Sequence, residues 1–231
     1  PETVGRLVLG RPPFRSLARA ATSTEHRTRL APLTAYHHRM PPATVQPRTP
    51  PPTPAGAGEL ARFPDGGYRV TFIRSYDRPA SELWLAVTEP PGLDTWYPTK
   101  LRHDGVVGNA IVETFEPGEG EPPIEVPPGT LTAYDPPHLF EVTVEGPAES
   151  KYPGELGTQV IRMRVTADGG SHPARSTLLF EHDVETLPTA VNVLPGWHWC
   201  LEFLAAHFGQ QADTSKEHHD RLRAWYEAAY A

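Results

Sequence analysis

An apolar stripe close to the C-terminus places the strongest constraint on the fold of this chain. The stripe consists of Trp197, Leu201, Leu204 and Phe208. Its spacing of i, i+4, i+7 and i+11 predicts one amphipathic helix from about Val193 to Gln210. The preceding sequence, from residue 109 to residue 184, shows only short alternating segments separated by turns. A single long helix therefore follows a run of strands.

The predicted strands alternate between apolar and polar residues, which is typical of a sheet with one buried face. In the segment 139–145, Phe140, Val142 and Val144 share one face. Strands are also predicted at about 68–76, 109–116, 130–134, 158–166 and 176–184. Two short helices, one at 80–88 and one around Leu93–Tyr97, come after the first strand.

This order predicts an α+β fold, since helices do not alternate with strands. We expect a curved antiparallel sheet wrapped around the long C-terminal helix. One helix does not fill the concave side of such a sheet, so a cleft between the two is expected. A cleft of that kind is a natural site for an apolar ligand.

The first part of the chain differs in composition from the rest. Residues 1–62 contain 11 prolines, with 9 basic and 3 acidic residues, whereas the remainder holds 12 basic and 25 acidic residues. We expect a disordered Pro/Arg-rich leader at 1–62, a globular domain at 63–210 and an extra helix at 211–231. The pattern Thr214-x-x-Glu217 predicts the start of that helix. Whether residues 1–40 belong to the natural protein stays open.

Charge and cysteine content exclude several classes of partner and site. The acidic body argues against nucleic acid as a partner and against docking on an anionic membrane. Cys200 is the only cysteine, so neither an intrachain disulfide nor a Cys-rich zinc site is expected. This fits a reducing compartment, and we expect a cytoplasmic protein. No apolar run approaches the length of a membrane span.

The segment TFIRSYDRP at 71–79, followed by Leu83-Trp84 and Thr88-Glu89-Pro90, carries a family resemblance. It resembles the opening of the SRPBCC (START-like) superfamily, and more narrowly the family of the activator of heat-shock-protein-90 ATPase. Trp96-Tyr97 is similar to a Trp-Trp pair in that family, and Gly196-Trp197 to the opening of its last helix. The resemblance covers about residues 67–210. It implies the helix-grip fold and roles that include co-chaperone action and lipid or polyketide binding.

Eight side chains are expected to line the cleft between the sheet and the helix. They are Trp96, Tyr97, Phe140, Met163, Phe180, His182, Trp197 and Leu201. For the aromatic residues, simple core packing is the alternative interpretation. His182 shares a strand face with Leu178 and Phe180, where a hydrogen-bonded core histidine is commoner than a catalytic one.

The histidines near the C-terminus suggest a metal site only weakly. His198 and Glu202 are four residues apart on one side of the predicted helix, where a charged helix flank is the alternative to a metal or acid–base pair. His218 and His219 are adjacent and point about 100° apart on a helix, so they do not share one ion easily. We expect no metal, no cofactor and no catalytic residue.

The sequence favours a protein that binds an apolar or amphipathic small molecule. A co-chaperone-like module with a chaperone as partner is the first alternative. An enzyme of the cyclase or aromatase type, with His182 or Tyr97 as acid–base groups, is the second. The residues do not specify the ligand or the oligomeric state.

Overall fold

The computed structural model describes residues 52–64, 66–115, 124–125, 128–146, 157–169 and 175–230. Within these ranges the elements, in chain order, are β1 (Glu59–Arg62), β2 (Tyr68–Tyr76), α1 (Ala80–Thr88), α2 (Pro90–Trp96), β3 (Lys100–Arg102), β4 (Ala110–Phe115), β5 (Ile124–Glu125), β6 (Gly129–Asp135), β7 (Leu139–Glu145), β8 (Thr158–Ala167), β9 (Ser176–Val184), α3 (Leu187–His207) and α4 (Lys216–Tyr230). The expected α+β class is confirmed.

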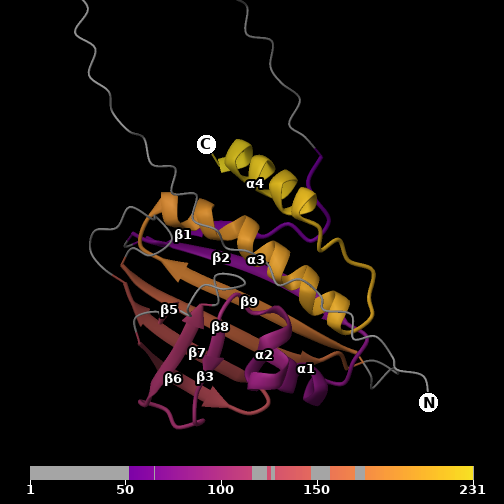
Figure 1. Cartoon of the computed structure of the whole chain (residues 1–231). Coiled ribbons are helices and arrows are strands. Elements are labelled where there is room, and N and C mark those ends of the chain that lie inside the picture. Colours follow the sequence, from indigo (N-terminus) through magenta and orange to yellow (C-terminus); the bar gives the residue numbers. More distant parts are fainter. Residues whose placement is uncertain are drawn as a thin grey trace, which may run out of the picture.

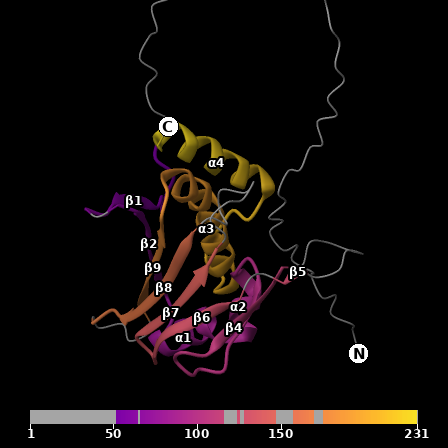
Figure 2. The same cartoon turned by 90° about the vertical axis from the view of Figure 1, so that its left-hand side faces the viewer.

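The strands form one antiparallel sheet in the order β1-β2-β9-β8-β7-β6-β4-β3, with β5 paired to β4. The first long strand, β2, thus pairs with the last strand, β9, and β1 and β3 are the two edges of the sheet. Helix α3 lies across the concave side, and α4 lies against the opposite side of α3 (Figures 1 and 2). This arrangement is the helix grip.

The inner and outer faces of the sheet differ as the alternation predicts. In β8, Ile161, Met163 and Val165 are buried, while Arg162 and Arg164 lie on the other face. The alternation in β7 follows the same rule. The inner face is therefore apolar and is covered by α3.

Charged residues link the strands across the outer face. Arg69 on β2 donates to Asp183 at 2.7 Å and to Glu181 at 2.8 Å, both on β9. Arg162 on β8 pairs with Glu141 on β7 and with Asp183. The Arg69 and Arg162 guanidinium groups hold the pKa of Asp183 below its usual value, although burial opposes them. The network crosses four neighbouring strands and leaves the inner face free of charge at these positions.

Helix α3 begins six residues earlier than the sequence pattern indicates. Thr186 is the N-cap, and its hydroxyl accepts from the backbone N–H of Thr189 at 3.2 Å. Pro188 lies in the first turn, where a missing N–H costs nothing. Pro195 lies inside the helix and leaves one carbonyl without its usual i+4 donor. These prolines hid the first two turns from sequence analysis.

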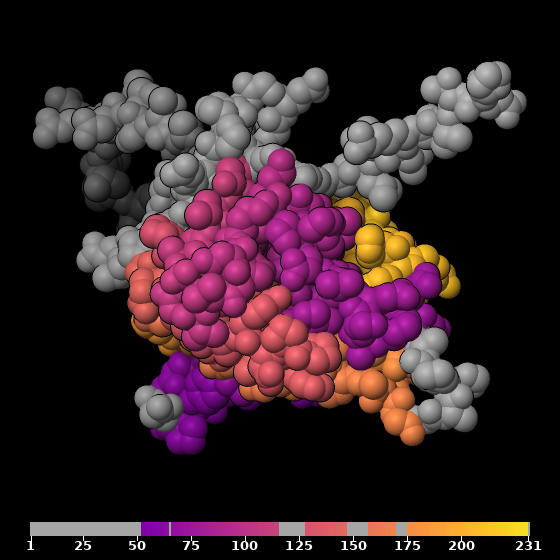
Figure 3. Space-filling view, turned by 90° about the horizontal axis from the view of Figure 1, so that it is seen from below, coloured from indigo at the N-terminus to yellow at the C-terminus, as the bar shows by residue number. Residues whose placement is uncertain are grey.

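The short helices α1 and α2 close one end of the molecule. Helix α1 has the predicted bounds, and α2 starts at Pro90, separated from α1 by Glu89 alone and three residues before the predicted start at Leu93. The indole N–H of Trp96 donates to the carbonyl of Ala86 at 3.0 Å and ties the two helices together. Figure 3 shows this end, where segments from α1 to β7 lie side by side.

The N-terminal boundary differs from the expected one at residue 62. Residues 59–62 form β1, which pairs with residues 68–71 of β2. The N–H of Gly58 donates to the Tyr226 hydroxyl on α4 at 2.7 Å. A Cβ at Gly58 would lie 2.5 Å from the ring of Phe72, so only glycine fits there. The segment 52–62 therefore belongs to the folded body, and residues 1–51 lie outside the described residues.

Helix α4 is present as expected, but its cap differs from the predicted Thr214/Glu217 pair. The Ser215 hydroxyl accepts from the backbone N–H of His218 at 3.2 Å, one residue later than predicted. Leu222 and Tyr226 are buried against the rest of the fold. Among the described helices, none combines the length and the apolar character that crossing a membrane requires.

Candidate functional site

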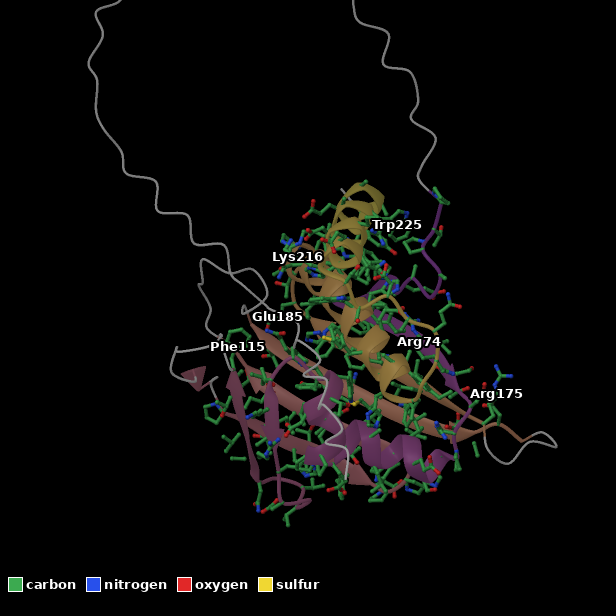
Figure 4. All side chains as sticks on the ribbon, turned by 45° about the vertical axis from the view of Figure 1, so that its right-hand side comes forward. Arg74, Phe115, Arg175, Glu185, Lys216 and Trp225 are labelled. Atoms are coloured by element: carbon green, nitrogen blue, oxygen red, sulfur yellow. The ribbon has the colours of Figure 1, made fainter. Side chains whose placement is uncertain are left out.

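The space between α3 and the inner face of the sheet brings the eight predicted residues together. All eight are at most 6% exposed: Trp96, Tyr97, Phe140, Met163, Phe180, His182, Trp197 and Leu201. Met163 lies between Phe140 and Phe180 in register on the neighbouring strands. The side chains of α3 and of the strands occupy the space between them (Figure 4). Their burial in one interior is the arrangement of a packed core, which was the alternative interpretation for the aromatic residues.

Trp197 is the centre of this interior. Its ring centroid lies 4.6 Å from that of Phe180 on β9 and 5.3 Å from that of Tyr97 at the end of α2. Trp96 also contacts Phe180, at 6.5 Å. Aromatic contacts at these separations are favourable beyond the burial of area. At this position α3 meets the sheet in direct contact.

His182 is a hydrogen-bonded residue of the interior. The indole N–H of Trp197 donates to Nδ1 of His182 at 2.8 Å, and an indole can only donate. Nδ1 is therefore unprotonated, so Nε2 carries the hydrogen and donates to Oε1 of Gln159 at 3.0 Å. Burial lowers the pKa of His182 to about 4, which keeps the ring neutral. With both nitrogens engaged, His182 orients Trp197 and Gln159.

A second polar group in the interior was missed by sequence analysis. Glu113 on β4 is 8% exposed, and its Oε2 accepts from the Thr99 hydroxyl at 2.7 Å. Burial raises the pKa of the Glu113 carboxyl. Glu113 is two residues after the buried Ile111 in β4, so the two side chains lie on the same face of the strand. This spacing is the one feature of the sequence that indicates an inward-facing Glu113.

Tyr97 lies beside this carboxyl. Burial raises the pKa of its hydroxyl most, and the nearby Glu113 and Cys200 raise it further. Burial also raises the pKa of the Cys200 thiol, which disfavours the reactive thiolate. Thr99 and Glu113 are thus hydrogen-bonded at one side of an apolar interior, and Tyr97 is near enough to interact electrostatically with the Glu113 carboxyl.

A hollow of about 330 Å³ lies elsewhere, at the end of the sheet. It is lined by Gly66, Gly67, Thr158, Asp183, Val184 and Glu185. None of these is a predicted site residue. The hollow is open to solvent and separate from the Trp197 interior, so it gives no support to the predicted site.

Comparison with protein-family models and with curated protein sequences gives no match. Solved structures give many. The crystal structure of CalU16 from Micromonospora echinospora is similar over 77% of this chain and 99% of that chain, with a TM-score of 0.55 and 19% identity. The protein encoded by BPP1335 from Bordetella parapertussis has a TM-score of 0.53 and 20% identity over 78% of this chain and 94% of that chain. A conserved protein of unknown function from Enterococcus faecalis, EF2215, has a TM-score of 0.53 and 15% identity over 74% and 89%.

The fold is a START-like helix grip. The similar chains are covered almost completely, so the likeness extends over the whole sheet-and-helix body. At identities near one fifth, the comparisons establish the fold and leave the function to the residues of this chain. Those residues place one apolar interior, with two polar groups, between the sheet and α3.

Proposed function

We propose that this protein binds an apolar or amphipathic small molecule between α3 and the inner face of its sheet. The observation that carries the proposal is the Glu113–Tyr97–Thr99 group in the aromatic interior. A buried carboxyl costs free energy unless it is hydrogen-bonded, and Thr99 donates one hydrogen bond to Glu113. A hydroxyl group of a ligand could make a further hydrogen bond to the same carboxyl.

The aromatic residues would hold the apolar body of such a ligand. Trp197, Phe180 and Tyr97 are joined by edge and tilted ring contacts, and Met163 is an adaptable side chain on the same face. Because α3 and the sheet touch here, binding would displace these side chains by rotamer changes. The helix-grip fold supports this proposal, since it encloses the space between a helix and a curved sheet.

We expect the neutral dye Nile red to bind the full chain saturably, with one dye per chain. Trp197→Phe should weaken binding about tenfold, corresponding to about 1.4 kcal/mol, because it removes ring area at the centre of the interior. Trp225→Phe, on α4, is the matched control and should bind as the unmodified chain does. Fluorescence titration measures the dye affinity of each variant, and urea melts measure its stability. Equal affinities in the two folded variants would contradict the proposal.

The resemblance to the activator of heat-shock-protein-90 ATPase supports a second candidate, a co-chaperone-like interaction module. The specific observation is an apolar surface at 106–112, where Val106, Val107 and Val112 are each more than half exposed. Val112→Glu should abolish binding to a chaperone and leave Nile red binding unchanged. Pull-down of the unmodified chain and of Val112→Glu with purified heat-shock protein 90 tests this second candidate. A catalytic role for His182 receives no support, because both ring nitrogens are already hydrogen-bonded.

A further inference from the structure

A group of three possible metal ligands lies between α3 and α4, away from the Trp197 interior. His198 and Glu202 are on α3 and His218 is on α4, and one ligand atom from each lies within 4.8 Å of the other two. The ring centroids of His198 and His218 are 6.0 Å apart. Nε2 of His198 is 3.7 Å from Oε1 of Glu202. The packing of two helices thus brings together residues 16 to 20 positions apart in sequence.

The two histidines present unused nitrogens. Nε2 of His198 and Nε2 of His218 are both buried, and neither has a hydrogen-bond partner among the described residues. The His198 side chain is only 1% exposed. A buried polar atom without a partner is destabilising, by about 1–3 kcal/mol. Two such nitrogens thus lie beside one carboxylate.

The opposite nitrogen of each ring faces an oxygen, as is usual for metal-binding histidines. Nδ1 of His198 lies 3.0 Å from the Tyr226 hydroxyl, which also accepts from the N–H of Gly58. Nδ1 of His218 lies 3.7 Å from Oδ2 of Asp213 and 3.4 Å from Nη2 of Arg221, which can only donate. For His198, an Nδ1–H donated to the Tyr226 hydroxyl leaves the Nε2 lone pair free for an ion. For His218, binding through Nε2 requires that Nδ1–H turn to Asp213 in place of its contact with Arg221.

Two cationic groups lie near the cluster. Arg74 on β2 interacts electrostatically with His198, and Nη2 of Arg221 on α4 lies 3.4 Å from Nδ1 of His218. Arg74 adds a positive charge that opposes a cation, and the Glu202 carboxylate offsets it. We expect this balance to give moderate affinity for an ion.

We propose that His198, His218 and Glu202 bind one divalent transition-metal ion, with Zn²⁺ as the best match. Two imidazole nitrogens and one carboxylate oxygen are a ligand set typical of zinc. Bonds of about 2.1 Å would bring the ligand atoms to roughly 3.4 Å from one another, so the side chains would close in by about an ångström. The ion would fasten α4 to α3 and, through Tyr226 and Gly58, the segment 52–62.

Zn²⁺ uptake by the chelator-stripped full chain tests this proposal. We expect one additional Zn²⁺ per chain, relative to His218→Gln, by equilibrium dialysis and elemental analysis. His219→Gln is the matched control, because His219 is adjacent on α4 but stacks on Trp199 at 4.7 Å. It should keep the full uptake. Subtracting the Zn²⁺ uptake of a variant from that of the unmodified chain removes the contribution of the other histidines.

A second variant keeps the test independent of folding. Glu202→Gln should weaken Zn²⁺ binding at least tenfold, and Zn²⁺ should raise the thermal midpoint of the unmodified chain but not that of Glu202→Gln. Co²⁺ should give the visible absorption of a four-coordinate site only where His218 and Glu202 are both present. Equal uptake by the unmodified chain and both variants would overturn the proposal, as would no uptake above the chelator-treated background.

Discussion

A chain that begins at residue 63 is expected to lose about 3–4 kcal/mol of its free energy of unfolding. A chain that begins at residue 52 is expected to keep nearly all of it. The difference comes from the segment 52–62, which the structure places in the folded body. Urea melts followed by circular dichroism measure both truncations.

The contacts of this short segment explain the size of the effect. Its removal deletes β1, takes the Gly58 N–H away from the Tyr226 hydroxyl and uncovers the ring of Phe72. A buried hydrogen bond contributes about 1 kcal/mol, and newly exposed apolar area about 25 cal/mol per Å². Tyr226→Phe removes only the hydroxyl and should cost about 1 kcal/mol. Coinciding urea midpoints for the two truncated chains would show that β1 adds nothing to stability.

Acidification from pH 7 to pH 4.5 should lower the free energy of unfolding by about 3–5 kcal/mol, through His182 and His198. Burial lowers the pKa of His182 to about 4 and that of His198 to about 3, whereas an unfolded histidine titrates near 6.5. The unfolded chain therefore binds more protons in this range. The stabilisation is complete above pH 6.5 and is lost progressively as the pH falls toward the folded values.

The raised pKa of Glu113 acts in the opposite direction, since the folded state then binds the extra proton, and it partly offsets the loss. Urea melts at half-unit pH steps measure the slope. His182→Gln combined with His198→Gln should flatten the curve between pH 6.5 and 4.5, whereas His207→Gln, an exposed control, should leave it unchanged. An unchanged slope in the double variant would contradict the assignment.

The fold could be predicted where local patterns decide it. The bounds of β7 and β9 follow from alternation along most of each strand, and those of α1 from Pro79 before it and Pro90 after it. The start of α3 was missed because Pro188 lies in its first turn and Pro195 lies further inside the helix. The β1 strand was missed because Glu59–Arg62 is short and follows a Pro/Gly-rich stretch; its stability comes from pairing with β2.

The candidate site divides in the same way. Alternation on β7, β8 and β9 places Phe140, Met163 and Phe180 on the inner face. Glu113 was missed, because a charged residue in a strand is ordinarily on the outer face. The meeting of His198 with His218 depends on how α4 packs on α3, and no spacing along the chain contains that information. His218 and His219 do point in different directions, as predicted, since His219 stacks on Trp199.

The binding of a ligand in the interior can be tested with the two methionines of the chain, Met40 and Met163. Met163 is fully buried between Phe140 and Phe180, whereas Met40 lies far outside this region of the sequence. With ¹³C-methyl-labelled methionine, saturation with Nile red should shift the Met163 methyl resonance and leave that of Met40 in place. A Met163 resonance that stays fixed while the dye saturates would show that binding occurs elsewhere on the molecule.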